Sequence, residues 1–249
     1  MGFMKNTQIV LNFLVFADKI ANGSLQNELL ADSKALDFQA VEIRREYFKD
    51  IKKEIPLIKE EASRLNLTLF YSVPDEVYVA GNINPNLKGY IQEAKAMGVK
   101  QIKWNIGDFK GELHTTELKA LVDSGVGITI ENDQTQTSGT IAAIKKYMTA
   151  VKTTDLGIGY VYDLGNWRFV GEDEIKAAEE LAEYVHYIHV KDVRYENDQP
   201  QATGLDHGVI DWRKVLGILP ANLPIAIEYP TNTNEEILEA KSLLEEEVK

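Results

Sequence analysis

Short apolar runs recur along the chain, and most of them are rich in β-branched residues. Each run is followed by a longer segment in which apolar residues repeat with helical spacing. The starts of successive runs are 25 to 39 residues apart, which is the length of one strand, one helix and two connections. The pattern predicts eight strands: Gln8–Phe16, Gln39–Arg44, Leu67–Ser72, Gln101–Ile106, Val126–Asn132, Gly157–Asp163, Val185–Lys191 and Pro224–Tyr229.

Several segments between these runs have the pattern of amphipathic helices. Gly98 is expected to end one of them, because glycine readily adopts the left-handed conformation that closes a helix. Acidic residues in the first turns of the last two helices suit the positive end of the helix dipole. The predicted helices are Ser24–Leu36, Asp50–Leu65, Leu87–Met97, Glu172–Tyr184 and Asn234–Glu247.

Regular alternation of strand and helix predicts a parallel sheet with right-handed crossovers. Eight such units form either a closed barrel or an open doubly wound sheet. An open sheet usually carries a glycine-rich first turn for a nucleotide, but the first turn here, Ala17–Ile20, has no glycine. The length of 249 residues also matches the ~250 typical of a barrel. We therefore predict an α/β fold, a single (β/α)8 TIM barrel that spans residues 1–249 as one domain.

Composition narrows the choice of partners. A formal net charge of −12 repels nucleic acid and anionic lipid, so neither is an expected partner. The chain has no apolar run of the ~18 residues that a membrane span needs, and its start, Met1–Asn6, has no apolar signal core. The absence of cysteine excludes disulfides and thiolate metal sites. These features predict a cytoplasmic protein with a small-molecule substrate, and they leave a homo-oligomeric assembly open.

Four candidate metal ligands stand at the ends of the last four predicted strands: Glu131, Asp163, His189 and Glu228. Functional residues of a barrel lie at the carboxyl ends of its strands, so these side chains should meet at one mouth. Three carboxylates placed together repel one another, and a divalent cation relieves that repulsion. Oxygen ligands with a single nitrogen favour Mn²⁺ or Mg²⁺, while Co²⁺ and Zn²⁺ remain options. We predict one divalent ion.

Each of these residues also has an ordinary structural interpretation. A lone carboxylate at a strand end usually caps a helix or pairs with a lysine, and a lone histidine among apolar residues is usually a hydrogen-bonded core residue. We interpret His186 as such a core residue and His114 as a surface loop residue. Four hard ligands on four successive strand ends are harder to explain in this way.

At this point the chain resembles the xylose-isomerase-like superfamily, in particular its sugar phosphate isomerase/epimerase branch. The resemblance covers most of the chain and depends on the order and spacing of several short motifs. These are Val41–Arg44, Ile130–Asn132, Asp163, His189–Asp192, the glycine-bracketed loop Gly204–Trp212, and Glu228.

The resemblance implies one metal ion, often Mn²⁺, held by the four strand-end residues and bound directly to substrate oxygens. Such an ion stabilises the enediolate that forms when a proton leaves the carbon next to a carbonyl. In similar epimerases two glutamates move this proton from opposite faces of the sugar, so Glu131 and Glu228 are the expected acid/base pair. The substrate would be a sugar, a sugar phosphate or a keto-polyol.

Further residues are candidates for substrate binding. Glu42 and Arg44 are expected at the rim of the second strand, with Lys191, Arg194 and His207 near the seventh; a solvated or salt-bridged role is the alternative for Arg44, Arg194 and His207. Asn166 stands where many relatives have a second histidine, and its amide donates a hydrogen bond but carries no proton at neutral pH. Two tryptophans form either an apolar wall for a sugar or part of the core: Trp104 and Trp167.

Three other functions are alternatives for this sequence. The apurinic-site endonuclease branch of the superfamily needs several more histidines than the four present here, and the negative charge also argues against DNA. A keto-polyol dehydratase, a lyase, would use the same metal and the same base. A non-catalytic sugar-binding barrel would keep the ligands without the chemistry.

Overall fold

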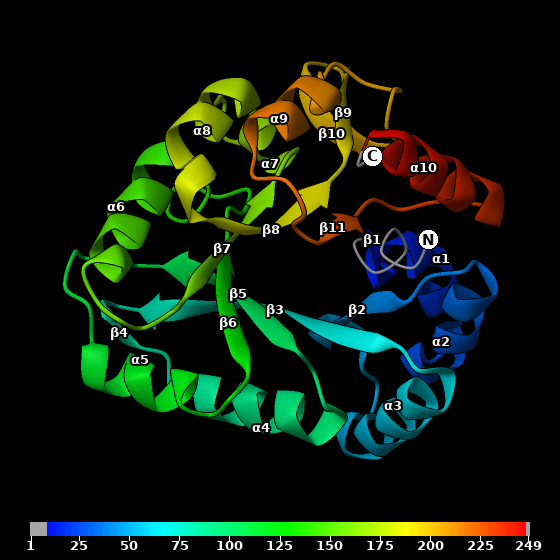
Figure 1. Cartoon of the computed structure of the whole chain (residues 1–249), viewed down its shortest axis with the longest axis horizontal. Coiled ribbons are helices and arrows are strands. Elements are labelled where there is room, and N and C mark those ends of the chain that lie inside the picture. The colour runs from blue at the N-terminus through cyan, green and yellow to red at the C-terminus, as the bar shows by residue number, and fades with distance from the viewer. Residues whose placement is uncertain (1–8, 248–249) are drawn as a thin grey trace.

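The computed structural model describes residues 9–247, and its centre is a closed barrel of eight parallel strands (Figure 1). The sheet runs in the order β2-β1-β11-β8-β7-β6-β5-β3, and pairing of β2 with β3 closes it. The barrel strands are β1 (Ile9–Asn12), β2 (Ala40–Arg44), β3 (Thr68–Val79), β5 (Gln101–Gly107), β6 (Gly127–Glu131), β7 (Gly159–Asp163), β8 (Val185–Val190) and β11 (Ile225–Ile227). The predicted TIM barrel is confirmed.

Helices surround the strands on all sides (Figure 1). Their ends follow local chemistry: the Asp50 carboxylate accepts a hydrogen bond from the backbone of Lys53 at the start of α3, and Gly98 ends α4 with a φ of 79°. The helices are α1 (Ala17–Ala21), α2 (Gln26–Ala35), α3 (Ile51–Leu65), α4 (Leu87–Met97), α5 (Thr115–Val122), α6 (Ile141–Lys152), α7 (Asn166–Phe169), α8 (Glu174–Leu181), α9 (Trp212–Ile218) and α10 (Asn234–Glu247), with 3-10 turns at Phe13–Phe16, Arg45–Tyr47 and Ala182–Tyr184.

The first and third strands differ from their predicted bounds. The first was expected over Gln8–Phe16; Gln8 lies outside the described residues, and the strand ends at Asn12, whose side chain accepts a hydrogen bond from Leu14 and starts a 3-10 turn. The third continues beyond Ser72 to Val79 and pairs with the short β4 (Asn82–Ile83). The first apolar run therefore carries two backbone conformations, whereas the third strand continues beyond its apolar run.

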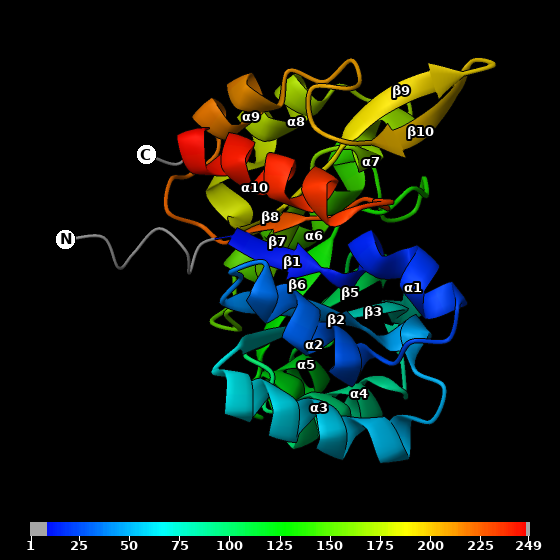
Figure 2. The same cartoon turned by 90° about the vertical axis from the view of Figure 1, so that its right-hand side faces the viewer.

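A hairpin after β8 was not predicted. It consists of β9 (Asp192–Glu196) and β10 (Gln199–Thr203), joined by Asn197 and Asp198, which both have a positive φ. Asparagine and aspartate tolerate this conformation, and two such residues make the tight turn of a two-residue hairpin. Figure 2 shows the hairpin extending beyond the barrel on the side toward which β1 points, which is the carboxyl-terminal mouth.

Across residues 9–247, none of the helices combines the length and the apolar character that crossing a membrane requires. The expectation that no signal core precedes the barrel concerns Met1–Asn6, which lies outside the described part of the chain.

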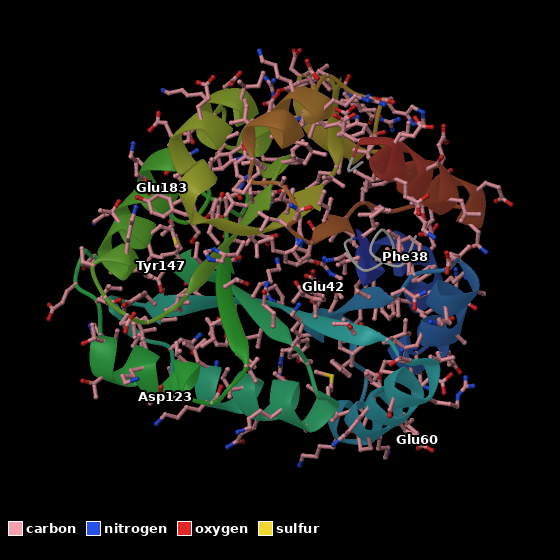
Figure 3. The ribbon with its side chains drawn as sticks, viewed as in Figure 1. Phe38, Glu42, Glu60, Asp123, Tyr147 and Glu183 are labelled. Atoms are coloured by element: carbon pink, nitrogen blue, oxygen red, sulfur yellow. The ribbon has the colours of Figure 1, made fainter. Side chains whose placement is uncertain are left out.

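The interior of the barrel has an apolar floor beneath polar residues. The main core packs between the strands and the helices, while a second, smaller cluster fills the barrel itself: Val10, Ala40, Phe70, Val161, Tyr187 and Ala226. Because side chains alternate along a strand, the next inward position on several strands lies closer to the carboxyl end, and there the residues are polar. Figure 3 shows Glu42 within the ring of strands, whereas Glu60, Asp123 and Glu183 lie on the outer surface.

Candidate metal centre

The four predicted ligands meet at the carboxyl-terminal mouth of the barrel. One ligand atom from each of Glu131, Asp163, His189 and Glu228 lies within 4.8 Å of the others, and all four residues are at most 3% exposed. They come from β6, β7, β8 and the residue after β11, which are consecutive neighbours in the sheet. The parallel register brings Asp163 level with His189, so residues distant in sequence lie side by side.

Three of these ligand atoms are buried without a hydrogen-bond partner among the described residues: Glu131 Oε1, Asp163 Oδ2 and His189 Nδ1. The imidazole Nδ1 is 2.7 Å from Glu131 Oε1 and 3.3 Å from Glu228 Oε2. The contacts of these atoms are ionic ones with each other and with Lys191, so carboxylate oxygens and an imidazole nitrogen lie close together at one place. Oxygen atoms and one imidazole nitrogen are suitable donors for a divalent cation, so this group can bind a metal.

A second layer of contacts orients the imidazole. Nε2 of His189 lies 3.0 Å from Glu42 Oε2, and the Tyr187 hydroxyl donates to the same oxygen at 2.5 Å. When Nε2 donates its proton to Glu42, Nδ1 presents its lone pair to the ligand group. Glu42 was expected at the rim of the mouth, but it is fully buried below His189 because it occupies an inward position one step deeper on β2.

The electrostatics of the group suit a divalent cation. Burial raises the pKa of Asp163 to about 7, even though the Lys191 ammonium opposes that shift. Burial disfavours the charged imidazolium of His189, yet the surrounding carboxylates, above all Glu42, raise its pKa well above the ordinary value. Both shifts arise where several carboxylates are buried close together, and a divalent ion would offset the repulsion between them.

Three basic side chains contact the ligand carboxylates. Lys191 Nζ lies 2.7 Å from Asp163 Oδ2 and 2.9 Å from Glu228 Oε2. Arg44 donates to Glu228 Oε1 at 2.9 Å, and Lys103 forms an ion pair with Glu131 Oε2. Each glutamate therefore has one oxygen near His189 and the other bound by a base. Burial favours the neutral acid, but the nearby cations hold the pKa of both glutamates below the ordinary value.

Lys103 was missed in the sequence. It belongs to the strand Gln101–Gly107, where Ile102, Trp104 and Ile106 face the helices and the alternate positions face the barrel interior. An inward lysine in a buried strand needs a partner, and this alternation was the available signal.

Asn166 supports the site through backbone contacts. Its amide nitrogen donates to the Asn132 carbonyl at 2.8 Å, and its amide oxygen accepts from Gln134 at 3.1 Å. Asn132 in turn holds the backbone of Asp163 on both sides, since its oxygen accepts from Asp163 N and its nitrogen donates to Asp163 O. This network of amides fixes the end of β7 beside the ligand group.

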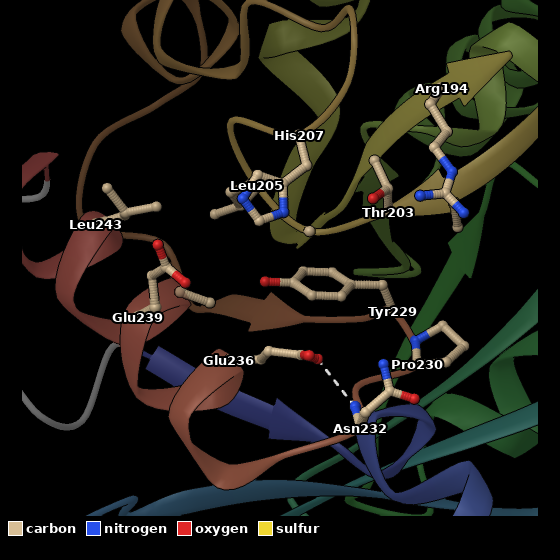
Figure 4. A pocket seen from close by; sticks show the side chains of 13 residues that line it. Arg194, Thr203, Leu205, His207, Tyr229, Pro230, Asn232, Glu236, Glu239 and Leu243 are labelled. Carbon is tan, nitrogen blue, oxygen red and sulfur yellow. Dashed lines mark hydrogen bonds between the residues drawn. The ribbon is translucent and has the colours of Figure 1, made fainter.

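Arg194 and His207 line a different cavity. It has a volume of about 270 Å³ and lies between the β9–β10 hairpin, the loop that follows it and α10, and none of the four ligand residues lines it (Figure 4). Arg194 is more than half exposed and pairs with Glu196 at 2.7 Å. The structure therefore separates these two candidates from the ligand group.

The glycine-bracketed loop is fastened to the barrel by aspartates. The Asp192 carboxylate accepts from the backbone of Gly208 at 2.8 Å and of Ile210 at 2.9 Å, and Asp206 accepts from the Trp212 indole at 2.8 Å. A Cβ on Gly208 would lie 2.3 Å from Asp192 Oδ1. The motif therefore shapes the wall beside the mouth.

Other candidates take structural positions. Trp104 and Trp167 are fully buried and belong to the core rather than to a wall of the mouth. His186 makes the expected hydrogen bond, from Nδ1 to the Tyr184 carbonyl at 2.7 Å, but it is exposed and not a core residue. It lies near the start of β8, where the register with β7 shifts between Val185 and Tyr187. His114 is partly exposed in the loop before α5, as expected.

The sequence profile of the family described as xylose isomerase-like TIM barrel matches residues 30–247. The chain belongs to this family. A comparison with curated protein sequences gives no match.

Solved structures similar to this chain include several proteins of known or suggested activity. They are the IolI protein with a bound zinc atom (16% identity, TM-score 0.69, 97% of this chain and 98% of that one), a probable 3-DHS dehydratase, AsbF, from Bacillus anthracis (10%, 0.68, 95% and 98%), and a D-allulose 3-epimerase from Methylomonas sp. in complex with D-allulose (14%, 0.67, 98% and 97%). At these identities the likeness concerns the fold.

Proposed function

We propose that this protein is a divalent-metal-dependent isomerase or epimerase that acts on a hydroxy-ketone of the carbohydrate or polyol class. The observation that carries the proposal is the convergence of buried ligand atoms from Glu131, Asp163, His189 and Glu228, which lie within 4.8 Å of one another. Mn²⁺ is the ion that this donor set favours, and Mg²⁺, Co²⁺ and Zn²⁺ are the alternative divalent ions. The similar epimerase and the similar zinc-containing structure support the assignment.

The bound ion would polarise a carbonyl group and the neighbouring hydroxyl. The C–H bond of the hydroxyl-bearing carbon would thereby become more acidic. Glu131 and Glu228 both approach His189 Nδ1, at 2.7 and 3.3 Å, and are our candidates to remove and return the proton. Each has its second oxygen engaged, by Lys103 or by Arg44, so proton transfer requires that contact to loosen when substrate binds. Lys191 lies within 3 Å of two ligand carboxylates and is the alternative proton carrier.

A dehydratase remains the second candidate, since a similar structure bears that name and loss of water needs the same proton abstraction. We place either activity in the cytoplasm, consistent with the acidic, cysteine-free composition.

The test is solvent exchange. The Mn²⁺-loaded protein is incubated in D₂O with a panel of ketoses and keto-polyols, and deuterium incorporation next to the carbonyl is followed by NMR. We expect exchange for at least one compound, together with an isomer or epimer as product; an unsaturated product would identify the dehydratase. Binding without any exchange would identify a non-catalytic sugar-binding barrel and would refute the proposal.

A further inference from the structure

Lys191 contacts two of the metal-ligand carboxylates at once. Its ammonium nitrogen lies 2.7 Å from Asp163 Oδ2 and 2.9 Å from Glu228 Oε2. The lysine side chain is only 6% exposed, so water screens these contacts very little. Lysine is almost never buried to this extent unless it is paired, and here one ammonium pairs with two acidic residues of the ligand group.

The two oxygens that Lys191 contacts are those that remain for a metal. The other oxygen of Asp163, Oδ1, accepts from two backbone amides of the following loop, each at 3.0 Å. The other oxygen of Glu228, Oε1, accepts from Asn12 at 3.2 Å and from Arg44 at 2.9 Å. A metal held by these two carboxylates would therefore use the oxygens that the ammonium contacts.

The other two basic residues of the site contact different oxygens. Lys103 pairs with Glu131 Oε2, whereas Glu131 Oε1 is the oxygen that lies 2.7 Å from His189 Nδ1. Arg44 likewise contacts the glutamate oxygen that does not face this ligand nitrogen. Both can keep their contacts when an ion binds. Lys191 can keep its own only with its positive charge directly beside the ion.

The stem of Lys191 reaches the ligand group across Gly165. A Cβ on Gly165 would lie 2.4 Å from Lys191 Cγ and 2.9 Å from Lys191 Cδ. The φ of Gly165 is −84°, which any residue adopts, so the backbone conformation does not require a glycine here. A side chain at this position would exclude the lysine stem from its path. The glycine therefore makes room for an ammonium at the ligand oxygens.

We infer that Lys191 is an internal counter-ion that competes with the divalent ion for Asp163 and Glu228, and this inference rests on the proposed function. Oxygen ligands lie ~2.0–2.6 Å from such an ion, so the ion and the ammonium would be only a few ångströms apart. Like charges this close repel strongly in a buried site. Binding of the ion therefore displaces the ammonium, which links the position of the alternative proton carrier to metal occupancy.

Removal of the ammonium charge tests this competition. Mn²⁺ affinity is measured by calorimetry for the wild type, Lys191→Met, Lys191→Gln and the exposed control Lys95→Met. Methionine keeps most of the apolar stem, and glutamine keeps a hydrogen-bond donor without the charge. Circular dichroism checks the folding of each variant, and either neutral variant that folds decides the comparison. Urea unfolding is recorded with and without Mn²⁺.

We expect both neutral variants to bind Mn²⁺ at least about tenfold more tightly than the wild type, because the ion no longer has to break charge-assisted hydrogen bonds, each of which contributes on that order. Without Mn²⁺ these variants should unfold at lower urea concentration than the wild type, since the ligand carboxylates have lost a cation. Saturating Mn²⁺ should remove most of this difference. Lys95→Met should match the wild type throughout.

Equal Mn²⁺ affinity in the neutral variants would overturn the inference, because the ammonium would then not compete with the ion. Weaker affinity would also overturn it and would show that Lys191 only holds the ligands in place. Absence of Mn²⁺ binding in the wild type and in all variants would refute the proposed function itself.

Discussion

Each ligand side chain is oriented by the contacts of those of its atoms that do not face the other ligands. His189 is the clearest case: when its Nε2 donates to the Glu42 carboxylate at 3.0 Å, Nδ1 presents its lone pair to the ligand group. The strand-end positions of the four ligands were predictable from alternation along the strands. The roles of Glu42 and Lys103 were not, because a sequence does not reveal which inward side chain reaches which neighbour across the barrel.

Replacing Glu42 with glutamine tests this orienting contact. The variant keeps the shape and an acceptor oxygen but loses the charge that holds the Nε2 proton. We expect Mn²⁺ affinity to fall about 10–100-fold, as for other residues that orient a metal-binding histidine. Glu60→Gln on the exposed face of α3 is the matched control. A Mn²⁺ titration decides, and equal affinities in the two variants would show that Glu42 does not orient the ligand.

The acid/base role of the two glutamates is separable from their metal binding. In Glu131→Gln and Glu228→Gln we expect weaker metal binding and, at saturating Mn²⁺, turnover reduced by a further ~10²–10⁴-fold, because an amide accepts no proton. Asp163→Asn should recover more activity with excess metal. Turnover is measured across a metal titration with a substrate found in the exchange panel. If either glutamine variant turns over at a near-wild-type rate at high Mn²⁺, that residue binds the metal and does not transfer the proton.

Among the elements, the loop Gly204–Trp212 shows most clearly how particular residues hold a backbone segment in place. Asp192 binds two backbone amides of the loop and Asp206 binds the Trp212 indole, so the motif holds a wall beside the mouth. His207, a candidate for substrate binding from the sequence, lines the cavity beside α10. The hairpin that precedes this loop was not predicted, because its strands are mostly polar and partly exposed and so have no apolar alternation.

Two glycine substitutions test how tightly this loop is packed. Gly208→Ala places a methyl group against Asp192 and the Val193 carbonyl, so we expect a loss of about 1–3 kcal/mol in unfolding free energy. Gly217→Ala in α9 meets no atom within 4 Å and should be neutral or stabilise by up to about 1 kcal/mol. Urea unfolding measures both variants. Equal midpoints for the two would mean that the loop adapts freely.

For the whole molecule, the fold follows from repetition. Eight similar β-α units allow few arrangements, which is why the barrel and the neighbour order of the last four strands were predictable. The first and last residues of single strands were harder to predict from the sequence. In β1, for example, Asn12 ends the strand inside an apolar run. The barrel brings the four ligand residues together, although they span nearly a hundred positions of the chain.

The most direct test of this account is a Mn²⁺ titration followed by electron paramagnetic resonance of the free ion. We predict saturable binding of one equivalent per chain, lost or strongly weakened in Asp163→Ala and unchanged in Asp123→Ala, an exposed control residue in the turn after α5. Bound ion should also raise the unfolding midpoint, since it stabilises only the folded state. Absence of saturable binding, or the same binding in Asp163→Ala as in the wild type, would contradict a metal centre at the mouth of this barrel.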